Sequence, residues 1–248
     1  MKKIAILLTL GALIFACDPG TMSDTGDSFT GTGGSMARFT CIGNHLYVVD
    51  DTYLQTFDIS DSSKISRTSR IEARWGTSIE TIFPKDSLLF LGSTGGMYIF
   101  NLKNSSAPQY VSMTEHFTSC DPVVVQGKYA YVTLRTDNDV NACSRGVNQL
   151  QVIDISNIDE PVNKGIYEMD NPRGLAIDGN LLFVCDGMKL AVLNVTDPLH
   201  VTETKRFELD GTPYDVIAKN GILILSYSSG LKQYFYTSDN IQEISTLY

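Results

Sequence analysis

The chain has 248 residues, of which 43% are hydrophobic and 19% charged, and its 19 basic and 28 acidic residues give a formal net charge of −9. An acidic chain without a basic patch is a poor match for nucleic-acid phosphates, so we exclude nucleic acid as a partner. The length suffices for one well-buried all-β domain.

The first sixteen residues read as an export signal. Two lysines precede an apolar run, Ile4 to Ala16, that is too short to span a bilayer. The run ends in Ile14-Phe15-Ala16-Cys17, which resembles the lipobox of bacterial lipoproteins. The resemblance implies cleavage before Cys17 and acylation of its sulfur and new amino terminus, which together anchor a protein stably in a membrane. The alternative is an ordinary secretory signal followed by a chance cysteine.

Residues 17–35 are expected to form a flexible tether, because they are rich in Gly, Ser, Thr and Asp and hold a single aromatic residue, Phe29. Cleavage would leave 17 basic and 28 acidic residues, a net charge near −11. No later hydrophobic stretch approaches membrane-spanning length.

From residue 36 onward the chain repeats itself. A short strand motif recurs after 43, 41, 52 and 41 residues, as 45–48, 88–91, 129–132, 181–184 and 222–225. A second motif follows each copy, as 54–59, 97–102, 150–155, 190–195 and 231–236. Two motifs that keep one period indicate repeated structural units. The one long interval is explained by an insertion, Arg135 to Asn148, between the two motifs of the third repeat.

Each period has room for a leading and a trailing strand as well, for example Arg173 to Ile177 and Val201 to Phe207. Four short strands in about 41 residues predict an all-β fold, a five-bladed β-propeller of four-stranded antiparallel blades. A β-sandwich would not explain a four-strand unit of fixed length. We expect blade five to pack on blade one, and the predicted blades are 36–75, 76–117, 118–170, 171–210 and 211–248.

Two third-strand motifs carry a family resemblance. Leu150 to Ile155 followed by Pro161, and Leu190 to Val195 followed by Asp197-Pro198, resemble the LVIVD repeat, a β-propeller repeat of bacterial surface and exported proteins. The resemblance runs from Phe39 to the C-terminus and is sharpest in repeats three and four. It implies a propeller fold and an envelope location, and it brings no shared catalytic motif.

Asp58 and Asp154 end their third strands and are followed by serine two residues later. Such residues cap turns by bonding to their own backbone. Calcium binding is the alternative, but no carboxylate cluster accompanies them, so we predict no metal and no cofactor.

The channel mouth is the predicted place for a binding site. Aligning the repeats on Gly43, Asp86, Gly127, Gly179 and Asn220 makes five leading-strand residues equivalent: Ala37, Glu80, Asp121, Arg173 and Tyr214. These should ring the mouth above an apolar plug of Phe39, Ile82, Val123, Leu175 and Val216.

The same face should also carry Tyr53, Trp75, Arg135, Arg145 and Asp186. Aromatic anchors with a few charges and the longest loop are typical of a binding surface. The alternative is that these are solvated turn residues, with Trp75 wedged between blades.

The remaining cysteines suggest one disulfide. Cys120 and Cys143 fall on the same face of blade three and could form a bridge that closes the insertion, whereas Cys41 and Cys185 lie within strands of different blades as apolar fillers.

Catalysis has little support in the sequence. His45, His116 and His200 occupy unrelated repeat positions without metal-ligand spacing, and we assign no catalytic residue. The enzymatic alternative is a glycoside hydrolase using Glu80 and Asp121 as paired carboxylates. We therefore expect a lipid-anchored outer-membrane propeller, periplasmic or surface-exposed, that binds an envelope protein or glycan. A purely structural envelope component is a third reading.

Overall fold

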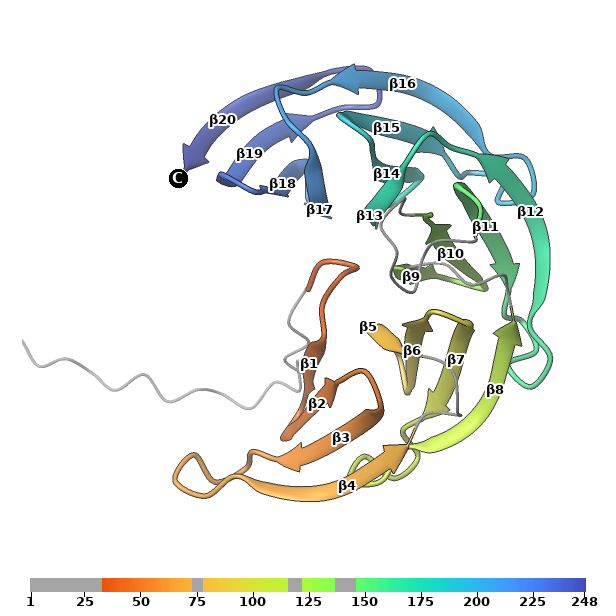
Figure 1. Ribbon diagram of the computed structural model, residues 1–248, viewed down its shortest axis with the longest axis vertical. Helices are drawn as coiled ribbons and strands as arrows, with labels where there is room; N and C mark the ends of the chain where they lie inside the picture. The colour runs from red at the N-terminus through yellow and green to blue at the C-terminus, as the bar shows by residue number, and fades with distance from the viewer. Residues whose placement is uncertain (1–32, 73–77, 116–121, 137–145) are drawn as a thin grey trace, which may run out of the picture.

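The computed structural model describes residues 33–72, 78–115, 122–136 and 146–248. In this part of the chain, twenty strands form five antiparallel sheets, each made of four consecutive strands (Figure 1). Blade one holds β1 (Phe39–Ile42), β2 (His45–Val49), β3 (Tyr53–Asp58) and β4 (Ser66–Glu72). Blade two holds β5 (Ile79–Lys85), β6 (Leu88–Ser93), β7 (Gly96–Asn101) and β8 (Gln109–Glu115).

The other three blades follow the same pattern. Blade three holds β9 (Val123–Gln126), β10 (Tyr129–Leu134), β11 (Gln149–Asp154) and β12 (Val162–Glu168). Blade four holds β13 (Pro172–Asp178), β14 (Leu181–Asp186), β15 (Lys189–Asn194) and β16 (Thr202–Glu208). Blade five holds β17 (Pro213–Lys219), β18 (Ile222–Tyr227), β19 (Gly230–Tyr236) and β20 (Ile241–Leu247).

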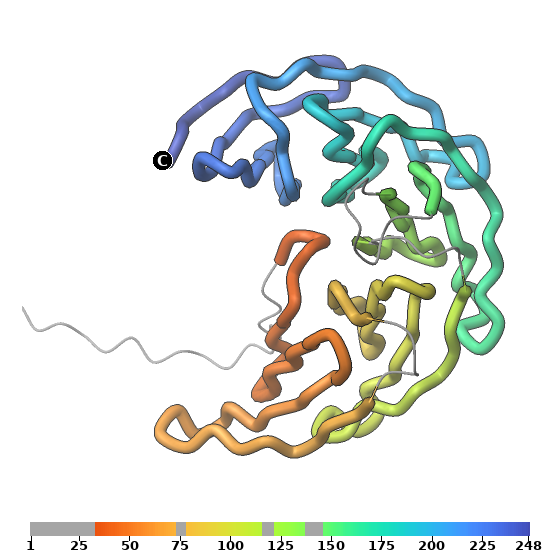
Figure 2. Tube along the Cα trace, in the orientation of Figure 1, coloured from red at the N-terminus to blue at the C-terminus, as the bar shows by residue number. Residues whose placement is uncertain are grey.

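The blades succeed one another around a common centre, with the leading strand of each innermost and the trailing strand outermost (Figures 1 and 2). The predicted fold class, a five-bladed propeller of four-stranded blades, is confirmed. The strands lie within the predicted blade spans, and the third strands begin and end about one residue from the motif positions.

The turn between the first two strands of each blade explains the regular period. Its first residue has a positive φ in every blade: 54° at Gly43, 52° at Asp86, 57° at Gly127, 57° at Gly179 and 52° at Asn220. Glycine adopts this left-handed conformation without steric cost, and Asp and Asn tolerate it better than other residues. The residues that aligned the repeats are therefore the ones that the turns require.

The outer strands protect the edges of the sheets. The pairing between third and fourth strands shifts register once in every blade, for example between Val152 and Ile153. Bulges of this kind, together with charged outer strands such as β16, discourage pairing with another chain.

The turns after the third strands use the side-chain caps predicted from sequence. Asp58 accepts a 2.8 Å hydrogen bond from the Ser60 amide, and Asp154 accepts a 2.9 Å bond from the Ser156 amide. The hydrogen bonds from Ser60 and Ser156 lower the pKa of both carboxyls. Asn194 makes the same bond to Thr196, so the turn needs an acceptor oxygen and not a charge.

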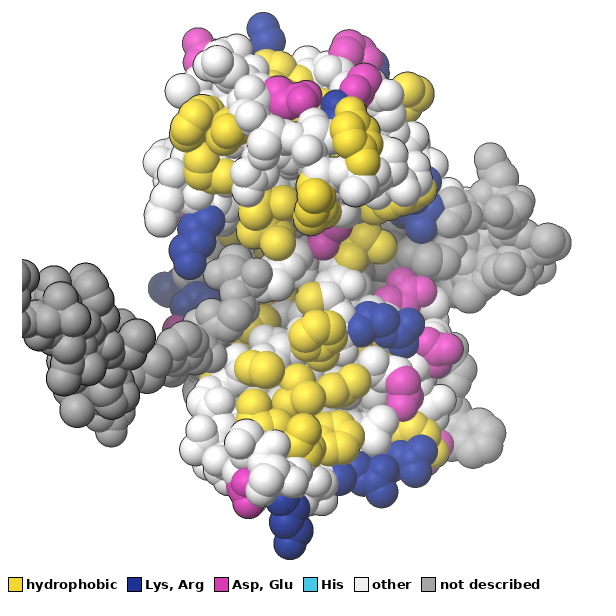
Figure 3. Space-filling model, turned by 90° about the vertical axis from the view of Figure 1, so that its left-hand side faces the viewer, with side chains coloured by type: hydrophobic (Ala, Val, Ile, Leu, Met, Phe, Trp, Pro, Cys, Tyr) yellow, Lys and Arg dark blue, Asp and Glu magenta, His cyan; other side chains and the backbone are white. Residues whose placement is uncertain are grey.

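The core is divided among the blade interfaces. In the described residues, four buried apolar clusters each lie between consecutive blades, and none joins blade five to blade one. Figure 1 accordingly shows an open ring, and the expectation that blade five packs on blade one was wrong. Hydrophobic side chains are visible on both sides of the opening (Figure 3).

The apolar plug predicted from sequence is buried at four of its five positions. Phe39 is 63% exposed, whereas Ile82, Val123, Leu175 and Val216 are buried.

A short segment at the start of the domain joins the two ends of the ring. Ser35, 1% exposed, donates a 2.9 Å hydrogen bond to the Asp215 carboxylate of β17 and accepts a 2.8 Å bond from the Leu175 amide of β13. The Met36 amide donates a 3.1 Å bond to the other oxygen of Asp215. Blade one is thus tied to blades four and five through polar contacts near the channel, because its sheet face does not reach them.

Asp215 makes this contact sensitive to pH. Burial raises the pKa of its carboxyl above the usual range, although the hydrogen bonds from Met36 and Ser35 oppose the shift. A raised folded-state pKa means that the ionised carboxylate costs stability at neutral pH, and that this cost disappears as the pH falls through the raised value toward the unfolded value.

We therefore expect Asp215→Asn to be more favourable, relative to the wild type, at pH 7 than at pH 4. The free energies of unfolding of both proteins, measured by denaturant titration at the two pH values, give this difference. Comparing the two proteins cancels the acid destabilisation that comes from the other carboxylates. A difference that is constant, or larger at pH 4, would contradict the assignment.

Candidate functional site

Irregularities in the leading strands position the predicted channel-mouth residues. The pairing of β5 with β6 shifts between Ile79 and Thr81, so that Glu80 forms a bulge. Corresponding shifts fall around Arg173 in β13 and Tyr214 in β17. Bulges redirect side chains and are common beside functional sites. Three of the five residues that the repeats made equivalent therefore share one backbone distortion at one end of their strands.

A pocket of about 280 Å³ lies at this end of the inner strands. It is built by blades one to four and contains three arginines and one glutamate. The residues that line it are Met36, Arg38, Glu80, Thr81, Pro122, Arg135 and Arg173. Glu80, Arg135 and Arg173, three of the residues chosen from sequence, thus come together in one pocket.

Several contacts orient the arginines. Arg38 donates a 2.7 Å hydrogen bond to the exposed Asp51 carboxylate and a 3.3 Å bond to the Ile79 carbonyl. The Arg173 carbonyl accepts a 2.7 Å bond from the Thr133 hydroxyl, which ties this bulge to blade three. The Arg173 guanidinium lies 5.5 Å from the ring centroid of Tyr214, within the range of a cation–π contact. Tyr214 is 39% exposed and extends the polar surface beside the pocket.

Tyr53, another predicted site residue, is not among the residues that line the pocket. Tyr53 sits in blade one with the Arg70 guanidinium 3.5 Å above its ring. Trp75, Asp121 and Arg145 lie outside the described residues, as do Cys17, Cys120 and Cys143.

Four residues that line the pocket were missed from sequence: Met36, Arg38, Thr81 and Pro122. The repeat alignment selected one residue per blade, which in blade one is Ala37. The blade-one side chains that line the pocket are those of its two neighbours, Met36 and Arg38. Successive side chains of an extended chain point to opposite sides. The sequence feature that could have identified Arg38 is its place directly after Ala37, a predicted channel-mouth position.

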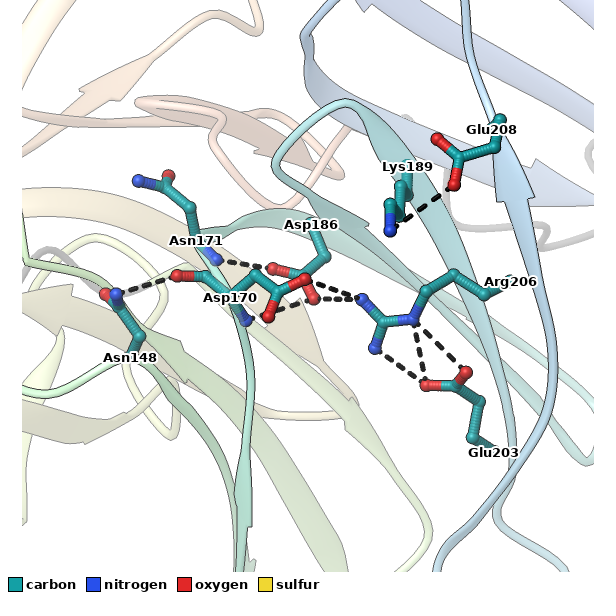
Figure 4. A network of polar contacts seen from close by, with 8 residues as sticks. All are labelled: Asn148, Asp170, Asn171, Asp186, Lys189, Glu203, Arg206 and Glu208. Atoms are coloured by element: carbon teal, nitrogen blue, oxygen red, sulfur yellow. Dashed lines mark hydrogen bonds and ion pairs between the residues drawn. The ribbon is translucent and has the colours of Figure 1, made fainter.

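Asp186 was expected on the binding face, but its side chain is fully buried and belongs to a structural network (Figure 4). It accepts a 2.6 Å hydrogen bond from the Asn171 amide and pairs with the Arg206 guanidinium at 2.5 Å. Arg206 also pairs with Glu203 at 2.7 Å, and hydrogen bonding to Glu203 raises the pKa of the guanidinium. The network fastens the segment between blades three and four to the body of blade four.

The described residues offer no obvious metal or thiol chemistry. No three His, Cys, Asp or Glu side chains in the described ranges are grouped as metal ligands. Cys41 is half-buried and Cys185 is buried, and both are free thiols. Burial raises the pKa of the Cys185 thiol well above its usual value, which makes it a packing residue. Within the same ranges, no helix is long and apolar enough to cross a membrane.

Comparison with solved structures places the fold among β-propellers. A periplasmic gluconolactonase from Pseudomonas aeruginosa has a TM-score of 0.67 at 11% identity, with 83% of this chain and 67% of that chain covered. A protein from Lactobacillus plantarum has a TM-score of 0.66 at 15% sequence identity, with 82% of this chain and 67% of that chain covered. A functionally unknown protein from Desulfotomaculum acetoxidans has a TM-score of 0.67 at 12% sequence identity, with 82% of this chain and 66% of that chain covered. At these identities the likeness shows the fold alone, and the chain spans about two thirds of their length.

The sequence comparison identifies the repeat. Residues 33–71, 119–139 and 145–169 match the LVIVD repeat. These segments lie in repeats one and three, and they do not include Leu190 to Val195, where the resemblance also appeared sharp. No curated protein matches the sequence closely enough to count as a relative. Three segments of the chain, in repeats one and three, are therefore similar to the LVIVD repeat, and the fold is β-propeller-like.

Proposed function

We propose that this protein is a non-catalytic, lipid-anchored β-propeller that binds a protein or glycan of the bacterial cell envelope through its channel-mouth face. The observation that carries the proposal is the pocket shared by four blades, because the leading-strand irregularities and a group of charged side chains coincide there. A regular scaffold that is irregular at one end is typical of binding proteins.

The anchor and the location rest on the leader sequence. A lipobox-like Cys17 after an apolar run supports acylation and export. We propose that the anchored protein lies at the outer membrane, with a periplasmic or surface-exposed domain. The P. aeruginosa protein is described as periplasmic, which agrees with export for a chain of this fold.

The glycoside hydrolase reading gains no specific support. Glu80 shares its pocket with Arg38, Arg135 and Arg173, whereas Asp121, the other carboxylate of that reading, lies outside the described residues.

Site-specific photo-crosslinking in whole cells tests the binding proposal. A photoreactive amino acid replaces Tyr214, beside the pocket, or Tyr110, a similarly exposed tyrosine on the outer strand β8. We expect an envelope component to crosslink at position 214 and not at 110, and Cys17→Ser to move the protein out of the membrane fraction. Equal crosslinking at both positions, or none at 214, would show that this face is not the binding surface.

A further inference from the structure

The charge of the channel-mouth pocket differs from that of the whole protein. Three guanidinium groups and one carboxylate line it, in a chain whose formal net charge is −9. Arg38, Arg135 and Arg173 come from blades one, three and four, so their convergence is a product of the propeller and not of one basic stretch. Guanidinium groups stay charged at all physiological pH values and donate hydrogen bonds in a fork that matches a carboxylate.

Two of the three arginines, Arg38 and Arg173, are held before a ligand arrives. Arg38 is oriented by the Ile79 carbonyl and Asp51, and two hydrogen bonds leave further donors on a group that has five. Arg173 sits on a bulge whose carbonyl is tied to Thr133, and its guanidinium lies beside the Tyr214 ring. Preorganised donors reduce the entropy lost on binding.

Glu80 narrows the choice of ligand. An ionised carboxylate only accepts hydrogen bonds and has about four acceptor positions, so a ligand that contacts Glu80 as well as the arginines would present donor groups to the one and an anion to the others. Met36 and Pro122 add an apolar wall. At about 280 Å³ the pocket lies at the small end of the range for ligand sites, which suits a single ring-sized group.

We propose that the pocket binds a sugar that carries a carboxylate, either free or as a residue of an acidic polysaccharide. Its carboxylate would pair with the arginines, its hydroxyl groups would donate to Glu80, and the C–H face of the ring would lie against Met36 and Pro122. In such a sugar the hydroxyls stand on carbons close to the carboxylate, as the compact pocket requires. In an acidic peptide the carboxylate ends an apolar stem and lies farther from the backbone donors. This inference rests on the proposed binding function and names its ligand class.

Isothermal titration of the lipid-free domain with galacturonate, trigalacturonate, galactose and an aspartate-rich peptide tests the inference. We expect galacturonate to bind at least about tenfold more tightly than galactose, because the charge-assisted hydrogen bonds exist only with the acid. Tighter binding of trigalacturonate than of the monomer identifies a polysaccharide as the source, and equal binding identifies the free sugar acid. Galactose binding as tightly as galacturonate, the peptide binding more tightly than either, or no sugar binding would overturn the inference.

Substitutions separate the pocket from general electrostatic attraction. Arg135→Ala and Arg173→Ala should each weaken galacturonate binding at least about tenfold, whereas Arg67→Ala, on the exposed outer strand β4, should leave it unchanged. Thermal unfolding checks that each variant folds, and the lysine variant at the same position, Arg135→Lys or Arg173→Lys, replaces an alanine variant that does not. Equal losses in Arg67→Ala and the pocket variants would contradict the site. Crosslinking at position 214 without sugar binding would reject this ligand and leave the proposed function standing.

Discussion

Replacing Arg206 with methionine is expected to lower the free energy of unfolding by about 3 to 5 kcal/mol. The fully buried Asp186 carboxylate would lose its charged partner, while the Asn171 amide would still hold it in place. Removing one partner of a buried ion pair costs more than the pair contributes, because an uncompensated charge stays in the interior. Urea denaturation of both proteins measures the loss.

Two further variants sharpen this prediction. Arg67→Met removes an exposed arginine whose hydrogen bond to Gln55 is 3.3 Å long, and it should change stability little. Adding Asp186→Asn to Arg206→Met should recover part of the loss, since the amide carries no charge and its oxygen can still accept from Asn171. If Arg206→Met costs no more than Arg67→Met, the network of Figure 4 does not hold blade four together.

Gly174→Ala is expected to lower the free energy of unfolding by about 3 kcal/mol, near the upper end for overpacking. A methyl group at this position would lie 2.1 Å from the Asp215 carboxylate and 2.6 Å from the Asp215 Cα atom. Rotation of a side chain cannot relieve a clash with the Cα atom, so β13 and β17 must separate. Because Arg173 precedes this glycine, galacturonate binding should weaken as well.

Gly211→Ala is the matched control. Its added methyl group would lie 3.6 Å from the Tyr227 ring, which is ordinary contact. The loss of freedom in the unfolded chain should leave stability unchanged or slightly raised. Thermal and urea unfolding of both alanine variants measure the difference, and similar stabilities would mean that the inner strands of blades four and five are not as close as described.

The blade architecture could be predicted because its signals are local. Two strand motifs set the period, and turn residues such as Gly43 and Asn220 must adopt a positive φ wherever the unit repeats. The insertion beginning at Arg135 changed one interval without disturbing the others. Local turn chemistry and strand patterning repeat with the sequence, so they can be read from it.

Closure of the ring could not be predicted in this way. It depends on the angle between successive blades, which side-chain packing at each interface sets and which no single repeat encodes. Exposed Phe39 on blade one and exposed Phe235 on blade five show the consequence of a curvature that leaves the ring open. The tie through Ser35 and Asp215 links residues 180 positions apart, and no sequence pattern announced it.

The location of the site could be predicted from the sequence, but the set of residues that form it could be predicted only in part. Repeat equivalence identified Glu80 and Arg173 because corresponding residues of a propeller lie at corresponding heights around the channel. It did not find Arg38, and it put Asp186 on the surface, since the burial of a strand-end carboxylate depends on a distant partner, Arg206. Pairings between side chains remote in sequence, such as Asp186 with Arg206, arise only in the folded protein.

A crystal structure of residues 33–248 is the most direct measurement of the central claim, that the blades assemble one binding pocket from distant residues. We predict five four-stranded sheets around one axis, with the side chains of Glu80, Arg135 and Arg173 lining a common pocket at one end of the inner strands. Two stacked sheets, or these three side chains at separate places on the surface, would contradict the account.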